Sequence, residues 1–218
     1  QILDPATGTG TFLVEVIYVI HKTLVAKWKA QGHGEKKIDE LWNEYVPKHL
    51  LTRLHGYELL MAPYAIAHLK IGLKLYETGY RFGSDERARV YLTNALEPAQ
   101  ESANKLEFAM SALAHEAHAV NAVKETTRFT VIVGNPPYSI VSANSGRWIV
   151  DLCEVYKTTV RGRERQIQAL SDDYVKFLRL AQWHFERSGV GALGIITNNG
   201  FLDGHLFVHF DKHLGTAG

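Results

Sequence analysis

Residues suited to holding an amino group lie in the middle of the chain. Asn135-Pro136-Pro137-Tyr138 directly follows the mostly β-branched run 130–133, which is typical of a buried strand in a parallel sheet. The two prolines stiffen this loop and leave it with few N–H groups and several outward carbonyls. The Asn135 side-chain oxygen can accept hydrogen bonds from a planar NH2 group while the Tyr138 ring stacks on the same molecule. A strand followed by an ordinary proline turn is the alternative.

A second candidate site opens the chain. Residues 1–3 end a strand, and residues 4–10 (Asp-Pro-Ala-Thr-Gly-Thr-Gly), here called the glycine turn, lead into a helix predicted from Thr11 to about Gln31. Glycines let a backbone approach a ligand, and a helix N-terminus offers unpaired N–H groups, so the pattern predicts a nucleotide-type cofactor. The turn lacks the third glycine of the dinucleotide fingerprint and the Lys of a P-loop. An ordinary turn between a strand and a helix therefore stays open.

Further along, the predicted second strand (residues 54–59) contains Glu58 near its end. An acidic residue at the tip of this strand is where a doubly wound fold binds a ribose diol, and a solvated Glu is the alternative. A packing helix is predicted over 61–76, and a third strand over 90–92. The apolar residues on which we base this helix are Ala65, Ile66, Leu69, Leu73 and Leu75.

Strands and helices that alternate in this way predict an α/β fold with a doubly wound, mostly parallel sheet. Residues 32–50 are predicted to be a helical insertion, and residues 139–170 an irregular loop. Asp172-Asp173 is predicted to cap a helix over 174–187. Residues 191–197 are predicted to form a further buried strand.

Composition excludes several classes of protein. The chain has 218 residues, a net charge of +1 and one cysteine, Cys153, so a disulfide framework is excluded and a reducing cytoplasm is predicted. No run approaches the length of a membrane span. The spacings His115/His118 and His205/His209/His213 fit chance better than metal binding, so no metal site is predicted. Because the chain opens directly in a strand, we expect it to be a piece of a longer protein.

Taken in order, the glycine turn, Glu58 and the Asn135–Tyr138 loop resemble the S-adenosylmethionine-dependent DNA adenine-N6 methyltransferases of the γ arrangement. The resemblance extends from residue 2 to about 205. It looks most like the large single-chain restriction–modification enzymes of the type ISP or IIG kind, which fuse nuclease, helicase, methylase and target-recognition parts. It implies a Rossmann-like class I methyltransferase domain over residues 1–218, truncated at both ends, with double-stranded DNA as partner and no membrane.

The resemblance also implies roles for individual residues. Asn135 and the Pro136 carbonyl would accept the two N–H bonds of the target amino group, and Tyr138 would stack on the flipped base. Glu58 would bind the ribose hydroxyls of S-adenosylmethionine. Asn94 stands where the family usually has an Asp that receives the cofactor's adenine amino group. The implied catalytic residues are Asn135, Pro136, Pro137 and Tyr138. The implied cofactor-binding residues are Asp4, Pro5, Ala6, Thr7, Gly8, Gly10, Phe12, Glu58, Leu59, Asn94, Ala95 and Asn135.

Other readings of the same loop stay open. Methyltransferases that act on cytosine N4, guanine N2 or protein glutamine need the same acceptor geometry. Cys153 lies between Leu152 and Glu154, and this setting differs from the Pro-Cys of the cytosine-C5 class. A non-catalytic module that kept the fold to bind DNA or a partner is the alternative from a different class. We expect a methyltransferase that needs no metal and no covalent nucleophile.

Overall fold

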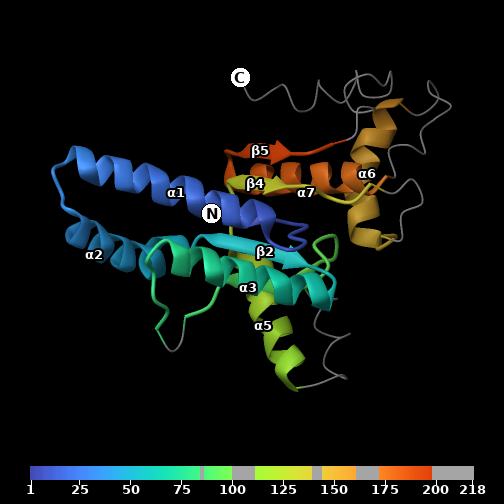
Figure 1. Ribbon diagram of the computed structural model, residues 1–218. Helices are drawn as coiled ribbons and strands as arrows, with labels where there is room; N and C mark the ends of the chain where they lie inside the picture. The colour runs from blue at the N-terminus through green and yellow to red at the C-terminus, as the bar shows by residue number, and fades with distance from the viewer. Residues whose placement is uncertain (84–85, 100–110, 139–143, 161–171, 198–218) are drawn as a thin grey trace. The chain divides into compact units, whose positions relative to one another are not determined.

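The computed structural model describes residues 1–83, 86–99, 111–138, 144–160 and 172–197. By their contacts the residues form two compact units, Gln1–Thr93 and Asn94–Gly218. Figure 1 shows the helices and strands of both, with labels where there is room. Each unit is described by itself.

The first unit contains three parallel strands, ordered β3-β2-β1. These are β1 (Ile2–Asp4), β2 (Leu54–Glu58) and β3 (Arg89–Leu92). Asp4 pairs with Gly56, and Glu58 pairs with Leu92, so the carboxyl ends of the strands lie at one edge of the sheet. In an open parallel sheet that edge is where ligands bind.

Two long helices connect these strands and pack against each other (Figure 1). Helix α1 spans Thr11–Ala30 and α3 spans Met61–Glu77. The helix predicted within residues 32–50 is confirmed as α2 (Glu35–Tyr45), which continues into a π-helix over Val46–Leu50. These helices share one apolar core with β2 and β3. Its buried members include Leu13, Ile17, Trp42, Val46, Leu54, Ala67, Ile71, Leu75 and Val90.

The buried face of α3 differs from the predicted one. Ile66, Leu69 and Leu73 are exposed, while Ala67, Ile71 and Leu75 are buried. Close approach explains the difference, because the turn before α1 meets α3 at Ala67 and leaves room there for a small side chain only. Apolar spacing predicted the helix correctly, and of the five residues on which it was based only Leu75 is buried.

The described part of the second unit contains two parallel strands, β4 (Val131–Gly134) and β5 (Ala192–Ile195), paired from Val131 with Ala192 to Gly134 with Ile195. Its described helices are α5 (Ser111–Thr126), α6 (Arg147–Val160) and α7 (Asp173–Ser188). The predicted cap of α7 is confirmed, since the Asp172 carboxylate accepts the Tyr174 N–H at 3.4 Å. Helix α7 packs against α6 and is buried over most of its first two turns.

Two predictions for this unit were wrong. Residues 147–160, assigned to an irregular loop, form α6, whose buried residues Ile149, Cys153 and Tyr156 recur at helical spacing. Strand β5 is exposed rather than buried. The described residues give it β4 as its one strand partner, and an edge strand has less of its surface covered.

Every strand pair within each unit is parallel, and helices connect the strands, which confirms the predicted α/β class with a mostly parallel sheet. No helix in the described part of the chain is long and apolar enough to span a membrane.

Candidate active site

The glycine turn is closed by hydrogen bonds at the carboxyl end of β1. Asp4 is fully buried, and its Oδ1 accepts the Ala6 N–H at 3.1 Å. The Thr7 hydroxyl donates to the Asp4 carbonyl at 3.0 Å, and the Thr7 N–H donates to the Tyr57 carbonyl at 2.9 Å. These bonds bring the turn against β2.

Glu58 joins the glycine turn to the loop after β2. Its Oε2 accepts the Gly8 N–H at 2.7 Å, and its Oε1 accepts the Leu60 N–H at 2.8 Å. A carboxylate has about four lone-pair directions, so each oxygen keeps capacity for one more donor, such as a ribose hydroxyl. Glu58 is therefore no solvated strand-end residue, because only 9% of its surface is exposed.

Close packing fixes the positions of the glycines. Gly10 ends the turn at φ 82°, and a Cβ there would lie 3.2 Å from the Cα and Cβ of Ala67 in α3. A Cβ on Gly56 of β2 would lie 2.5 Å from the Thr7 hydroxyl. Sequence reasoning missed Gly56, although a glycine inside a strand is a known sign of close backbone approach.

The electrostatics of Asp4 are unusual. Burial raises the pKa of its carboxyl to about 7, the Ala6 N–H opposes that shift, and the Glu58 charge adds to it. The second oxygen, Oδ2, is buried and has no hydrogen-bond partner among the described residues. A buried acceptor of this kind fits a cationic or N–H donor from a ligand.

The resemblance predicts that Asp4 and the backbone of residues 7–10 surround the methionine part of S-adenosylmethionine, and that Glu58 binds its ribose hydroxyls. Of the other predicted cofactor residues in this unit, Pro5, Thr7 and Gly10 are buried, Ala6, Gly8 and Phe12 are half-buried, and Leu59 is 61% exposed. The assignments stay predictions.

In the second unit, the predicted acceptor loop Asn135–Tyr138 follows β4 directly. Asn135, Pro137 and Tyr138 are exposed, whereas Pro136 is buried. The Tyr138 hydroxyl donates to Asn135 Oδ1 at 3.1 Å, and the Tyr138 ring meets the Tyr174 ring edge-on at 6.3 Å between centroids. The loop thus presents an amide oxygen and an aromatic face to its surroundings.

Asn94 also belongs to the second unit. Its Oδ1 accepts the Leu96 N–H at 3.0 Å, and its Nδ2 donates to Asn144 Oδ1 at 3.1 Å. Ala95, the neighbouring predicted cofactor residue, is buried. The buried Lys124 ammonium donates to the Asn94 and Glu97 carbonyls, and burial lowers its pKa to about 8.

Other residues that the sequence offers for chemistry lie partly inside and partly outside the described ranges. Cys153 is buried in α6, and burial raises the pKa of its thiol to about 11, so the thiol stays protonated at neutral pH. No group of three potential metal ligands occurs among the described residues. His118 is exposed on α5, and the His205, His209 and His213 spacing lies outside the described residues. The arginines at 161, 163 and 165 also lie outside them.

Sequence reasoning missed three further polar residues around these sites. Lys70 of α3 donates to the hydroxyls of Thr9 and Thr11 beside the glycine turn, at 3.3 and 3.1 Å. Asn144 and Asp173 lie in a hydrogen-bonded cluster with Asn94. No local sequence pattern predicts these contacts, because the two partners of each hydrogen bond are 29 to 61 positions apart in the sequence.

Comparison with solved structures identifies similar folds. The chain is 25% identical to the protein of the DrdV–DNA complex determined by cryo-electron microscopy, with a TM-score of 0.64 and coverage of 97% of this chain and 18% of that one. It also matches LlaGI, a Type ISP restriction–modification enzyme in a nuclease-deletion form with a DNA substrate mimic, at 22% identity and a TM-score of 0.69, covering 98% and 17%. The third match is LlaBIII, an ATP-dependent Type ISP enzyme bound to DNA, at 23% identity and a TM-score of 0.66, covering 98% and 14%.

The chain therefore spans less than a fifth of the length of each of these structures. No curated protein matches it. The family model described as Eco57I restriction-modification methylase matches residues 53–215, about three quarters of the chain. That span contains Glu58, Asn94 and the Asn135–Tyr138 loop. The chain belongs to the Eco57I restriction-modification methylase family.

Proposed function

We propose that this chain transfers a methyl group from S-adenosylmethionine to the N6 amino group of a flipped adenine in double-stranded DNA, as the modification activity of a restriction–modification enzyme. The observation that carries the proposal is the exposed Asn135–Tyr138 loop directly after β4, in a member of a restriction–modification methylase family. The DNA complexes of the structural neighbours support DNA as the partner.

The cofactor supplies an electrophilic sulfonium methyl group, so the protein has to hold and orient the two reactants. Asp4 accepts from the methionine ammonium, and Glu58 accepts from the ribose hydroxyls. Both side chains are already fixed by backbone N–H groups, so little reorganisation is needed on binding.

Asn135 Oδ1 and the Pro136 carbonyl accept the two N–H bonds of the target amino group. Two hydrogen-bond acceptors in the plane of the amine draw the nitrogen lone pair out of conjugation. The lone pair is then free to form the new bond to the methyl carbon. The Asn135 side-chain oxygen accepts a hydrogen bond from the Tyr138 hydroxyl in this structure, and its second lone pair can accept one from a substrate. The exposed Tyr138 ring stacks on the flipped base.

The proposal is tested by calorimetric binding of S-adenosylmethionine and by methylation of DNA, using wild type, Glu58→Ala and Asn135→Ala. We expect Glu58→Ala to abolish cofactor binding, because it removes the ribose acceptor and releases the Gly8 N–H. Asn135→Ala keeps cofactor binding and loses turnover. Glu77→Ala, an exposed residue at the end of α3, serves as the control and changes neither.

Identification of the methylated product separates the remaining readings. N6-methyladenine supports the proposal, whereas N4-methylcytosine, N2-methylguanine or methylated protein glutamine in its place contradicts the assigned acceptor. Cofactor binding without turnover on any acceptor, unchanged by Asn135→Ala, indicates a binding module. We further propose that the nuclease, helicase and target-recognition functions reside on the same full-length cytoplasmic protein.

A further inference from the structure

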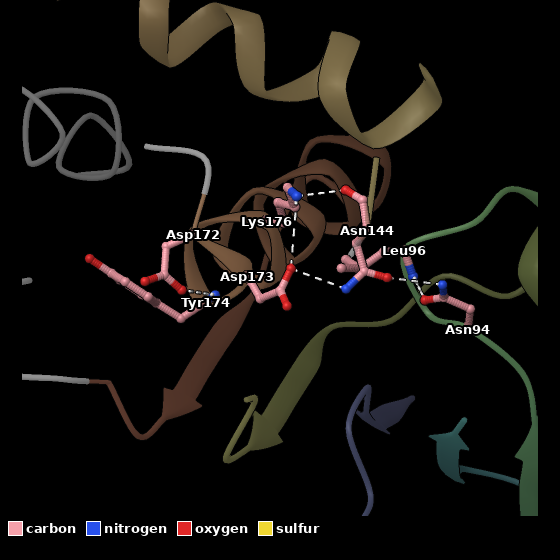
Figure 2. Close-up of polar contacts among 7 residues, drawn as sticks. All are labelled: Asn94, Leu96, Asn144, Asp172, Asp173, Tyr174 and Lys176. Atoms are coloured by element: carbon pink, nitrogen blue, oxygen red, sulfur yellow. Dashed lines mark hydrogen bonds and ion pairs between the residues drawn. The ribbon is translucent and has the colours of Figure 1, made fainter. Parts of the chain in front are cut away.

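A chain of hydrogen bonds with a single direction runs through the second unit (Figure 2). The Leu96 N–H donates to Asn94 Oδ1 at 3.0 Å, Asn94 Nδ2 donates to Asn144 Oδ1 at 3.1 Å, and Asn144 Nδ2 donates to Asp173 Oδ1 at 3.0 Å. It links the segment after β3, the residue that precedes α6 by three positions, and the first turn of α7.

The two ends of this chain fix its direction. A backbone N–H only donates, and a carboxylate only accepts, whereas each amide side chain has one donating and one accepting side. The Asp173 side chain is 7% exposed, and its Oδ1 lies 3.8 Å from the Lys176 ammonium and accepts the Asn144 NH2 group. Asn144 must therefore turn its NH2 group to Asp173 and its oxygen to Asn94.

The backbones at both amides are held as well. The Lys176 ammonium donates to the Asn144 carbonyl at 2.6 Å (Figure 2). The Lys124 ammonium donates to the Asn94 carbonyl at 2.8 Å. Since the backbone positions are fixed, the orientation of the Asn94 side chain depends on its hydrogen-bond partners.

We propose that Asn144 and Asp173 are positioning residues: they hold the Asn94 NH2 group toward Asn144 and so keep the Asn94 oxygen on the opposite side, as an acceptor for the adenine amino group of the cofactor. This inference rests on the proposed function. The Asn94 oxygen uses one lone pair for the Leu96 N–H and has a second for that amino group.

The chain of bonds also accounts for an Asn at position 94. In this structure Asn94 Nδ2 donates to Asn144 Oδ1 and, at 3.4 Å, to Glu97 Oε1. A carboxylate at position 94 would place an acceptor oxygen against both of these acceptor oxygens. Asn144 could flip to donate to that carboxylate only by turning its own oxygen toward Asp173, which also accepts. An Asn at position 173 would remove that conflict, because its NH2 group could donate to the flipped Asn144.

The test measures binding of S-adenosylhomocysteine and of S-inosylhomocysteine, which carries an oxygen in place of the amino group, by calorimetry on the full chain. Wild type is expected to prefer the adenine compound about tenfold or more, since the inosine oxygen would face the Asn94 acceptor. Asn144→Ala lowers this preference to about twofold or less. A purely structural role for Asn144 would weaken both compounds alike and leave their ratio unchanged.

Double substitution provides the sharper test. Asn94→Asp alone is expected to weaken binding of the adenine compound about tenfold. Asp173→Asn alone is expected to have a small unfavourable effect. In the double variant, Asp173→Asn is expected to restore the binding that Asn94→Asp lost. Asn43→Asp is the matched control. Asn43 also donates to carbonyls and accepts a backbone N–H, in the first unit, and Asp173→Asn should not rescue any effect of its substitution.

The outcomes separate this inference from the proposed function. Wild type that binds neither compound contradicts the proposed function. Wild type that binds both compounds equally, or retained preference in Asn144→Ala, overturns the inference alone. Additive effects of Asn94→Asp and Asp173→Asn also overturn it.

Discussion

Asp4 is a buried carboxyl group in the candidate cofactor site, and its burial has a cost to stability near neutral pH. Its carboxyl is fully buried, and one oxygen has no partner among the described residues. Functional sites commonly keep such groups because a ligand satisfies them. Asn135 and Tyr138 show the opposite property, since both side chains are exposed.

Asp4 should make stability depend on pH. Burial raises its pKa from 3.8 to about 7, so the folded state binds a proton more tightly than the unfolded state. Its contribution is fully present below about pH 4 and is lost as the pH rises through 7, by an amount on the order of a few kcal/mol. Urea unfolding across this range should show the loss in wild type. Asp4→Asn should lack that part of the slope, and equal slopes would contradict the assignment.

Cofactor binding should respond to pH in the opposite sense. The charged Asp4 carboxylate attracts the methionine ammonium, so affinity for S-adenosylmethionine rises as the pH increases through about 7. Calorimetry at several pH values measures this change. The test range is about pH 5 to 7, where an α-ammonium group keeps its proton, and an affinity that stays constant over it would remove Asp4 from the ammonium site.

Tyr138 separates stacking from hydrogen bonding. Tyr138→Phe keeps the aromatic ring and loses the hydroxyl that donates a hydrogen bond to Asn135, so this variant should keep most methylation activity. Tyr138→Ala loses stacking on the base, worth about 1–3 kcal/mol, and kcat/KM should fall at least about fivefold. Steady-state methylation of one DNA substrate compares them. Equal loss in both variants would show that the hydroxyl, rather than the ring, matters.

At the scale of elements, contact between α1 and α3 sets the shape of the glycine turn. Gly10 ends the turn in a left-handed conformation directly against Ala67, and Gly56 lets the turn lie on β2. The small residues are therefore requirements of packing. They also explain why α3 turns a face containing Ala67 inward.

Two glycine substitutions should act in opposite directions. Gly10→Ala is expected to destabilise the fold by about 1–3 kcal/mol, because its φ of 82° and its contact with Ala67 both disfavour a Cβ. Gly72→Ala lies in the interior of α3, where an added Cβ would meet no atom within 4 Å, and should stabilise the fold by about 0.5–1 kcal/mol. Urea denaturation of both variants tests the pair. Stabilisation by Gly10→Ala would contradict the close packing.

At the scale of the whole molecule, the chain covers a small part of each structural neighbour and carries a net charge of +1. Affinity for DNA draws on several contacts between basic residues and phosphates. A chain without a strong basic balance has little general attraction for a polyanion. Under the proposed function, sequence-specific binding is therefore expected to draw on the target-recognition part that we propose for a longer protein.

Residues 1–218 alone should methylate cognate DNA far more slowly than the full-length protein. Transfer of a labelled methyl group from S-adenosylmethionine to the same duplex, at equal protein concentrations, measures the difference. Binding of the cofactor by both proteins provides the control for folding. Equal rates of methylation would show that target recognition lies within these residues.

Local patterns determined much of this protein by themselves. Apolar runs ended by glycine, proline or a carboxylate marked the strands and their carboxyl ends, and helical spacing with an Asp cap marked α7. The candidate residues Asp4, Glu58 and Asn135 were readable because an acidic or amide group at the end of a parallel strand has a known chemical use. Helices, strands and candidate site residues of this kind can be recognised from the sequence because they depend on residues that are close in sequence.

Only the tertiary structure decided how these residues are paired. The bond from Gly8 to Glu58, the buried oxygen of Asp4, and the chain from Asn94 through Asn144 to Asp173 join segments up to 50 residues apart. The inward face of α3 and the exposure of β5 likewise depend on what packs against them. Burial and hydrogen-bond direction are properties of the assembled neighbours, so no single segment of sequence carries them.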